Sequence, residues 1–241
     1  MSTITGAILA GGLATRLRPV LPSVPKALAA VNGRPFITIL LDQMEHAGVR
    51  EVVLCTGHLG DQIRQALGSR YRGVQLCYSQ ESEPLGTAGA LRRALLHSTG
   101  DLWLVLNGDS HVAADFSDFI GWHRRQLWQG SLLLTWVQDC ARFGAVDLTP
   151  EGKVEAFQEK RAGRVAGWIS GGVYLLCRRL LETVPGNIPV SLEREVFPIW
   201  LKSGLGGYCV CAPFIDIGTP ESLAQADSFF AGDLWRGEPF S

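Results

Sequence analysis

The chain has 241 residues, 46% of them hydrophobic, and a formal net charge of −1 at pH 7. This is enough for a single domain with a sizeable core. The balanced charge argues against partners that need a broad basic surface, such as nucleic acid, or a polybasic run, such as an anionic membrane, so we expect small-molecule partners. No apolar run reaches about 18 residues and the N-terminus has no basic, signal-like region, so we expect a cytoplasmic protein.

A short apolar strand, residues 7–10, ends at a glycine pair and opens into a loop that carries cations. Gly11 and Gly12 have no Cβ, so backbone N–H groups can approach phosphate oxygens there. Arg16 and Lys26 can neutralise the charge of the same anion from the side. The loop has neither the P-loop pattern nor G-x-G-x-x-G, which disfavours hydrolysing P-loop enzymes and nicotinamide dehydrogenases. It therefore predicts a nucleoside triphosphate site of another kind.

Strand and helix patterns alternate in the first half of the chain. Helices are expected at residues 36–44, 60–67, 88–97 and 116–128, and strands at 51–56, 74–78 and 102–106. This order is typical of an α/β fold with a parallel sheet, in which ligands bind at the carboxyl ends of the strands. The glycine loop lies at that end of the first strand.

Two aspartates follow apolar strands. Residues 102–106 show no alternation, as expected for a central strand buried on both faces, and Asp109 comes directly after them. Asp216 lies in a second apolar strand that ends at a glycine turn. A carboxylate in such a place is costly to desolvate unless it is paired, so both are candidates for binding a divalent cation.

In the second half, strand follows strand. Three short strands are expected at residues 131–137, 145–148 and 154–158, where we place the second substrate. A strand at 171–177, a helix at 192–202, a strand at 207–211 and a helix from Glu221 follow. We treat 1–241 as one domain with a nucleotide-binding half (1–110), a second-substrate half (111–230) and a tail (231–241). Trp235 and Phe240 in the tail are expected to pack on the domain or on a neighbour, which leaves a homodimer open.

Lysine is scarce in this chain. Only four of its 22 basic residues are lysines: Lys26, Lys153, Lys160 and Lys202. In a chain that otherwise uses arginine, a lysine can mark a place that needs a compact ammonium group. Lys26 and Lys160 are candidates on that ground.

Glu81, five residues before Gly86, could accept two hydrogen bonds from guanine N1–H and N2–H₂. Uracil and thymine lack this donor pair, which favours GTP. A single carboxylate can also accept a pyrimidine N3–H, so the base stays open on these residues alone.

The glycine loop resembles the signature of the sugar-1-phosphate nucleotidyltransferases, G-G-x-G-T-R-L-x-P followed by P-K, with Ala14 in place of a glycine. At positive φ this alanine would cost about 1 kcal/mol. Other motifs look most like the guanylyltransferases that act on D-glycero-α-D-manno-heptose 1-phosphate: Glu83-Pro84-Leu85-Gly86-Thr87, Asn107-Gly108-Asp109, Arg142-Phe143-Gly144, Phe157-Gln158-Glu159-Lys160, Gly171-Gly172-Val173-Tyr174 and Ile215-Asp216-Ile217-Gly218.

The resemblance implies a three-layer α/β/α fold with a mixed, mostly parallel, Rossmann-like sheet. It implies transfer of a nucleoside monophosphate from GTP to a sugar 1-phosphate, with release of pyrophosphate and with Mg²⁺ as cofactor. The catalytic residues would be Arg16, Lys26 and Asp109, and the metal ligands Asp109 and Asp216. The nucleotide would be bound by Gly11, Gly12, Thr15, Arg16, Glu81, Pro84, Gly86 and Thr87. The sugar phosphate would be bound by Gly144, Glu159, Lys160, Gly172 and Val173.

Several alternatives stay open. Mannose-1-phosphate guanylyltransferases share several of these motifs, although the longer ones carry a C-terminal β-helix for which we expect no room here. A uridylyl- or thymidylyltransferase that acts on another sugar 1-phosphate is a further alternative. Ser170 stands where the heptose enzymes usually have asparagine. A metal-dependent glycosyltransferase favours D-x-D, whereas Asn107-Gly108-Asp109 offers one acid. A non-catalytic nucleotide sensor would be expected to have lost part of the set Arg16, Lys26, Asp109, Lys160 and Asp216.

Overall fold

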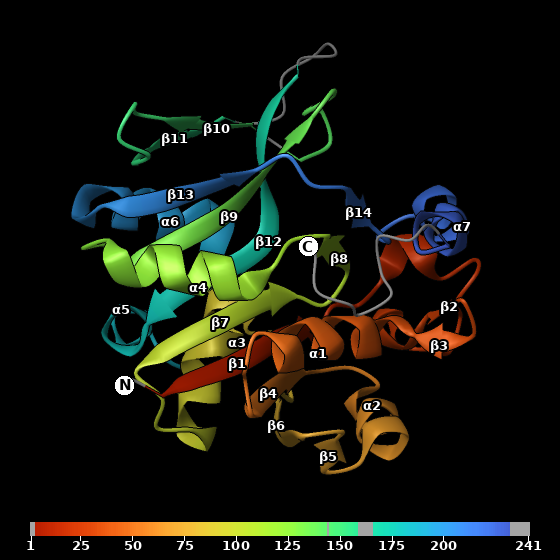
Figure 1. Cartoon of the computed structure of the whole chain (residues 1–241). Helices are drawn as coiled ribbons and strands as arrows, with labels where there is room; N and C mark the ends of the chain where they lie inside the picture. Colours follow the sequence, from red (N-terminus) through yellow and green to blue (C-terminus); the bar gives the residue numbers. More distant parts are fainter. Residues whose placement is uncertain (1–2, 144, 159–165, 232–241) are drawn as a thin grey trace.

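The computed structural model describes residues 3–143, 145–158 and 166–231, and one eight-stranded sheet forms the centre of this part (Figure 1). Its strand order is β13-β9-β12-β7-β1-β4-β6-β5. The strands are β1 (Ile4–Ala10), β4 (Glu51–Thr56), β5 (Arg70–Tyr71), β6 (Val74–Gln80), β7 (Leu102–Asn107), β9 (Gly130–Val137), β12 (Gly167–Cys177) and β13 (Leu205–Val210). Four of the neighbouring pairs are parallel, which confirms the mixed, mostly parallel sheet.

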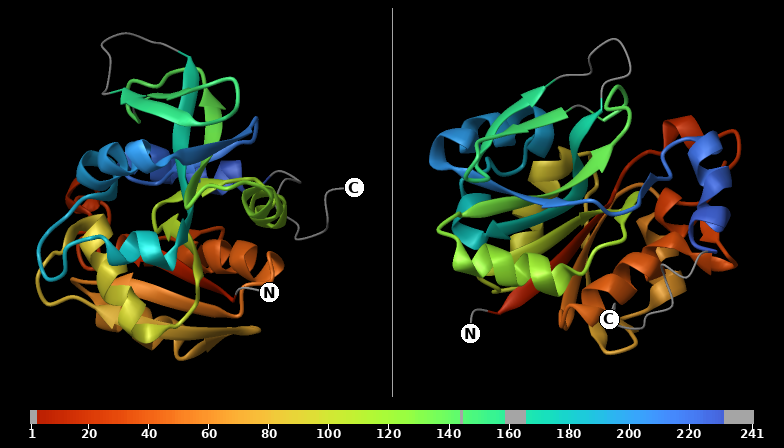
Figure 2. Two further views of the ribbon diagram at one scale, coloured as in Figure 1. Left: turned by 90° about the vertical axis from the view of Figure 1, so that its left-hand side faces the viewer. Right: turned by 45° about the horizontal axis from the view of Figure 1, so that its top comes forward.

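Helices cover both faces of this sheet (Figure 2). They are α1 (Phe36–His46), α2 (Gly60–Leu67), α3 (Gly86–Ala94), α4 (Phe116–Arg125), α5 (Arg178–Glu182), α6 (Phe197–Trp200) and α7 (Pro220–Phe229). Along β7, Leu104 and Leu106 belong to the core cluster that contains residues of α1 and α4. Trp103 and Val105 belong to the opposite cluster with residues of α3, α5 and α6. The run without alternation is therefore buried on both faces, and the three-layer fold is confirmed.

Three pairs of short strands stand outside the central sheet: β2 (Ala30–Val31) with β3 (Arg34–Pro35), β8 (Ser110–Val112) with β14 (Phe214–Asp216), and β10 (Ala145–Leu148) with β11 (Val154–Gln158). The pair β10–β11 lies beyond one end of the sheet in Figure 1. The expected strand at 131–137 is β9 of the central sheet, so only β10 and β11 form a separate unit there. Because β12 pairs with β7, one sheet runs through both proposed halves. The assignment of one half to the nucleotide and of the other to the second substrate stays a proposal.

The helix expected at 192–202 is present as one continuous helical stretch of three kinds: a π-helical turn η4 (Leu192–Val196), then α6, then the 3₁₀ turn η5 (Leu201–Ser203). Pro198 lies in the first turn of α6. Because proline has no N–H and its ring crowds the carbonyl four residues before it, the regular α-helical hydrogen bonding is disturbed at this point. The preceding turn is wide, and Val196 N–H bonds to Ser191 O at 3.1 Å.

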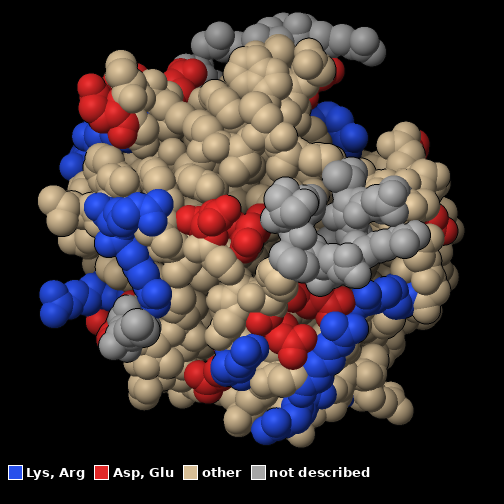
Figure 3. Space-filling view, viewed as in Figure 1, with Lys and Arg blue, Asp and Glu red and all other residues tan. Residues whose placement is uncertain are grey.

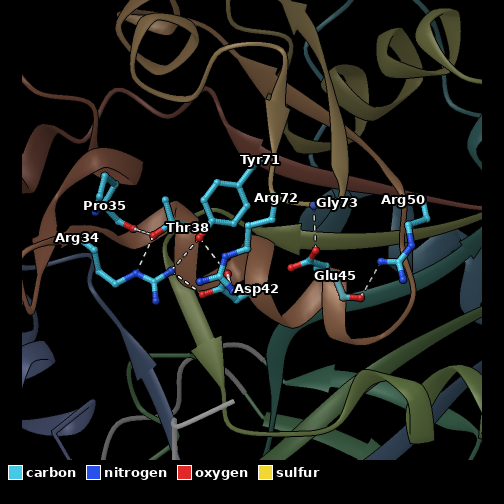
Figure 4. A network of polar contacts seen from close by, with 9 residues as sticks. All are labelled: Arg34, Pro35, Thr38, Asp42, Glu45, Arg50, Tyr71, Arg72 and Gly73. Carbon is cyan, nitrogen blue, oxygen red and sulfur yellow. Dashed lines mark hydrogen bonds and ion pairs between the residues drawn. The ribbon is translucent and has the colours of Figure 1, made fainter. Parts of the chain in front are cut away.

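Asp42 of α1 anchors the edge of the sheet (Figure 4). Its carboxylate accepts hydrogen bonds from Arg34 and from the Tyr71 hydroxyl at 2.9 Å, and Arg72 Nη1 lies 3.1 Å away. The side chain of Asp42 is 12% exposed. The short edge strand β5 is thereby tied to α1. The face shown in Figure 3 carries both acidic and basic side chains, in keeping with the small net charge.

None of the helices in the described part of the chain has the length and apolar character needed to cross a membrane.

Candidate active site

The glycine loop follows β1. It begins next to the residues that come directly after β4 and β6. A Cβ at Gly11 would lie 3.0 Å from Glu81 Oε1, whereas a Cβ at Gly12 would meet no atom within 4 Å. Ala14 has φ 47° and ψ 35°, the left-handed conformation. The 3₁₀ turn η1 (Thr15–Leu17) follows, with Leu17 buried and Thr15 exposed. The loop is thus held at Gly11 and Leu17 and open between them.

Lys26 and Asp109 meet directly. Lys26 begins the turn η2 (Lys26–Leu28), which is fixed by the buried Ala27. Its Nζ donates to Asp109 Oδ2 at 2.6 Å, and the side chains are 14% and 37% exposed. Gly108 brings Asp109 there, because its N–H bonds to Leu9 O at 3.0 Å and leaves no room for a Cβ. The turn after β7 is therefore pressed against the end of β1.

Asp216 joins this pair through β14. It pairs with Ser110 of β8, and Ile217 N–H donates to Asp109 O at 2.8 Å. Gly218 N–H donates to Asp216 Oδ1 at 2.6 Å and so holds the carboxylate in place. The two candidate metal ligands, which lie far apart in sequence, thus stand on neighbouring backbone segments.

Gly218 marks the point where the charged groups converge. A Cβ at this residue would lie 2.5 Å from Asp216 Oδ1, 3.0 Å from Lys26 Nζ and 3.2 Å from Arg16 Nη2. The structure therefore brings together all four residues to which the sequence analysis assigns catalysis or metal binding. Two cations and two carboxylates in one place suit a phosphorylated ligand and a metal ion.

Glu81 lies at the start of the loop after β6. Its Oε2 accepts from Leu85 N–H at 3.0 Å, and its Oε1 lies against Gly11 and Gly57. Burial raises the pKa of the Glu81 carboxyl, and the Leu85 N–H and the charge of Arg93 offset part of this rise. Glu81 is thus half-buried, with both carboxylate oxygens held against the backbone of neighbouring loops.

The rest of this loop is anchored by its neighbours. Pro84 and Gly86 are exposed, and Gly86 has φ +69° and no room for a Cβ, which would lie 2.5 Å from Val190 O. The Thr87 hydroxyl accepts from Leu192 N–H at 2.7 Å and donates to Glu193 Oε2 at 3.0 Å. Thr87 is thus turned toward η4.

The expected sugar-phosphate residues are only partly described. Gly144, Glu159 and Lys160 lie outside the described residues. Gly172 has φ +74° at an irregularity of β12, and a Cβ there would lie 2.4 Å from Ser110 Oγ. Val173 is 2% exposed and belongs to the hydrophobic core, so its side chain packs inside the domain.

Two polar residues near these groups, Glu193 and Tyr174, were given no role of their own by the sequence. Glu193, half-buried in η4, accepts hydrogen bonds from Thr87 and from Tyr174. Tyr174 is 1% exposed; burial and the nearby Glu193 charge raise the pKa of its hydroxyl, which Ser170 and Asn107 contact. Glu193 resembles a surface acid in a helical run, and no spacing rule would have revealed it.

Together, the fold and this convergence of charges define an α/β protein of the Rossmann-like, nucleotide-binding class. Residues 5–232 match the model of the nucleotidyl transferase family. The chain belongs to this family.

Two curated relatives illustrate the likeness. Mannose-1-phosphate guanylyltransferase of Mycobacterium tuberculosis is 34% identical over 238 residues, which cover 97% of this chain and 65% of the relative. The chain thus spans about two thirds of the length of that protein. D-glycero-alpha-D-manno-heptose 1-phosphate guanylyltransferase of Aneurinibacillus thermoaerophilus is 32% identical over 220 residues, with 91% of this chain and 95% of the relative covered.

Solved structures agree with the fold. HddC from Yersinia pseudotuberculosis complexed with GMP-PN superposes with a TM-score of 0.83 at 29% identity, over 95% of this chain and 100% of that chain. A putative glucose-1-phosphate thymidylyltransferase from Bacillus anthracis in complex with a sucrose gives a TM-score of 0.84 at 25% identity, over 99% of this chain and 98% of the other.

Proposed function

We propose that the protein transfers a nucleoside monophosphate from a nucleoside triphosphate to a sugar 1-phosphate and releases pyrophosphate. The observation that carries this proposal is the convergence of Arg16, Lys26, Asp109 and Asp216 around Gly218. Both reactants are anions, and the reaction between them needs cations that hold them together while charge builds at phosphorus.

The proposed reaction is an in-line displacement. An ionised phosphate oxygen of the sugar 1-phosphate forms a bond to the α-phosphorus, and the bond from that phosphorus to the β-phosphate oxygen breaks. The nucleophile is already ionised, so no general base is needed. Lys26 would hold the α-phosphate as charge builds there, and Arg16 with the backbone of Gly11 and Gly12 would hold the leaving pyrophosphate.

The donor set fits Mg²⁺. This ion binds to one or two carboxylates and completes its shell with water and substrate phosphates, and two carboxylates converge here. Within the described ranges, no group of three or more His, Cys, Asp or Glu side chains could hold a metal ion by itself. Asp109 and Asp216 would hold the ion, which would supply positive charge to the triphosphate when bound. The hydrogen bond from Lys26 to Asp109 Oδ2 would then weaken, because the ion would draw on the same carboxylate.

For the base we propose guanine. The half-buried Glu81 carboxylate lies beside Gly11, at the start of the proposed nucleotide loop, and would accept the guanine N1–H and N2–H₂. The two relatives described above carry guanylyltransferase in their names. A thymidylyl- or uridylyltransferase is the second candidate, favoured by the similarity to the Bacillus anthracis structure.

For the sugar we propose D-glycero-α-D-manno-heptose 1-phosphate, with mannose 1-phosphate as the alternative. The heptose relative is matched over 95% of its length and the mannose relative over 65%. Ser170 stands where the heptose enzymes usually have asparagine, and this difference argues against the same sugar preference in this chain.

The test is a pyrophosphate-release screen. ATP, CTP, GTP, UTP and dTTP are each combined with the 1-phosphates of D-glycero-α-D-manno-heptose, mannose and glucose in the presence of Mg²⁺. We expect the highest kcat/KM with GTP and the heptose phosphate. A best rate with mannose phosphate or with UTP or dTTP would replace that part of the proposal. No release above background with any pair, despite nucleotide binding, would favour the nucleotide-sensor alternative.

A further inference from the structure

Glu193 accepts hydrogen bonds from three hydroxyl groups, which come from both sides of the proposed active site. Its Oε2 accepts from Thr87 Oγ1 at 3.0 Å and from Ser191 Oγ at 3.2 Å. Its Oε1 accepts from the Tyr174 hydroxyl at 3.4 Å. In the described part of the chain, these donors are all hydroxyls and no lysine or arginine forms an ion pair with Glu193.

These hydrogen bonds continue on the side of β12. Ser170 Oγ donates to the Tyr174 hydroxyl at 3.4 Å and accepts from Gly172 N–H at 3.3 Å. The chain of bonds therefore runs from Gly172 through Ser170 and Tyr174 to Glu193, and every donor points toward the carboxylate. A hydroxyl that donates in one direction presents its lone pairs in the other. An acceptor at Glu193 therefore draws the hydrogens of Tyr174 and Ser170 toward itself, which leaves a lone pair of Ser170 Oγ to accept a further hydrogen bond.

We propose that Glu193 is a positioning residue that sets the direction of this hydroxyl chain, so that Ser170 Oγ presents an acceptor lone pair to a hydroxyl of the sugar phosphate. The inference rests on the proposed function. It deepens that function: a sugar hydroxyl would donate to Ser170 Oγ, and the hydrogen-bond chain that orients Ser170 ends at Glu193 in η4.

Replacing Glu193 with glutamine should keep the hydrogen bonds from Thr87 and Ser191 and change the one with Tyr174. The amide keeps one oxygen, which is favoured at the side that receives two donors, Thr87 and Ser191. Its NH₂ group then faces Tyr174, which must accept instead of donate. The Tyr174 hydroxyl hydrogen turns toward Ser170, and the chain on the sugar side reverses while the Thr87 side is kept.

The experiment measures KM for both substrates, kcat and Tm in the wild type, Glu193→Gln, Ser170→Ala and the double variant. We expect Glu193→Gln to raise KM for the sugar phosphate about tenfold, while KM for GTP and kcat stay within about threefold. In the Ser170→Ala background, Glu193→Gln should add less than about twofold, because the chain it orients no longer reaches the substrate. Glu195→Gln is the matched control: Glu195 is exposed, lies in the same turn and accepts from Ser191 N–H at 2.7 Å, which an amide oxygen can still do.

A purely structural role for Glu193 predicts a lower Tm and equal changes in both KM values. Equal changes, additive effects of the two substitutions, or no change at all would overturn the inference in an active enzyme. If Glu193→Gln does not fold, Tyr174→Phe, which removes the same donor, should give the same split. An inactive wild type would instead overturn the proposed function, and this inference with it.

Discussion

Lys26 Nζ lies 2.6 Å from Asp109 Oδ2, so the cation proposed for the α-phosphate and the carboxylate proposed for the metal neutralise each other directly. A metal ion that arrives alone must compete with this ammonium group. A metal ion that arrives with a triphosphate brings Lys26 a new anionic partner. We therefore expect the metal and the nucleotide to bind together.

Lys26→Met tests this competition. We expect the variant to bind Mn²⁺ in the absence of nucleotide about three- to tenfold more tightly than the wild type, because Asp109 is released, while turnover is lost. Electron paramagnetic resonance titration of free Mn²⁺ measures the affinity. Lys202→Met, at an exposed position, is the control and should bind Mn²⁺ like the wild type. Unchanged or weaker Mn²⁺ binding by Lys26→Met would contradict the competition.

Gly218→Ala should block the convergence of charges. The new Cβ would lie 2.5 Å from Asp216 Oδ1 and 3.0 Å from Lys26 Nζ, so at least one of these groups must move. Because a displacement of about 1 Å in an active site can cost about 100-fold, we expect a fall in kcat of that order. Tm should change by only a few degrees. Gly186→Ala is the control, since a Cβ there meets no atom within 4 Å. A Gly218→Ala enzyme with the wild-type kcat would show that this space is not needed.

Ala14→Gly should stabilise the protein slightly. Ala14 has φ 47°, a conformation that costs about 1–2 kcal/mol for an L-residue and little for glycine. Glycine also makes the unfolded chain more flexible, which offsets about 0.4–1 kcal/mol. We expect a net gain of about 0.5 kcal/mol, seen as a rise in Tm of about 1–2 °C. Ala66→Gly, at an exposed position inside α2, should instead lose about 1 kcal/mol. Equal losses in both variants would refute the strain at Ala14.

Local patterns predicted the elements better than the contacts between them. The strand before Asp109 and the glycine turn after Asp216 follow from residue order, because runs of apolar residues and glycines act over a few positions. The bond from Lys26 to Asp109 spans 83 residues and depends on the register of β1 with β7, which spacing does not give. The motifs indicate that these residues share a site, but they do not show that Lys26 and Asp109 form a hydrogen bond.

Two details of the second half depend on more than local patterns. The helix expected at 192–202 is present, but it begins as a π-helical turn, and that turn brings Glu193 toward Thr87 and Tyr174. Val173 was expected at the sugar pocket from its motif; its side chain is 2% exposed, and its part in sugar binding stays a prediction. A motif shows which backbone passes a site, whereas burial decides which side chain faces it.

The raised pKa of Glu81 makes the proposed guanine site sensitive to pH. Only the ionised carboxylate can accept both guanine donors, and burial shifts its protonation to higher pH than for an exposed glutamate. KM for GTP should therefore rise as the pH falls through this raised pKa. The same raised pKa also affects stability. The contribution of Glu81 to the free energy of unfolding is fully present below its pKa in the unfolded chain, and it is lost as the pH rises through the raised pKa of the folded state.

Glu81→Gln should raise KM for GTP about 10- to 100-fold, because the amide accepts one hydrogen bond and opposes the other. It should also remove the rise in KM at low pH. The measurement is KM for GTP between about pH 4.5 and 8, with Tm followed at each pH to separate binding from unfolding. Glu83→Gln, at an exposed position two residues away, is the matched control and should keep the wild-type profile. A wild-type KM that does not vary over this range, or a Glu81→Gln variant with the same KM and the same profile, would exclude Glu81 as the guanine acceptor.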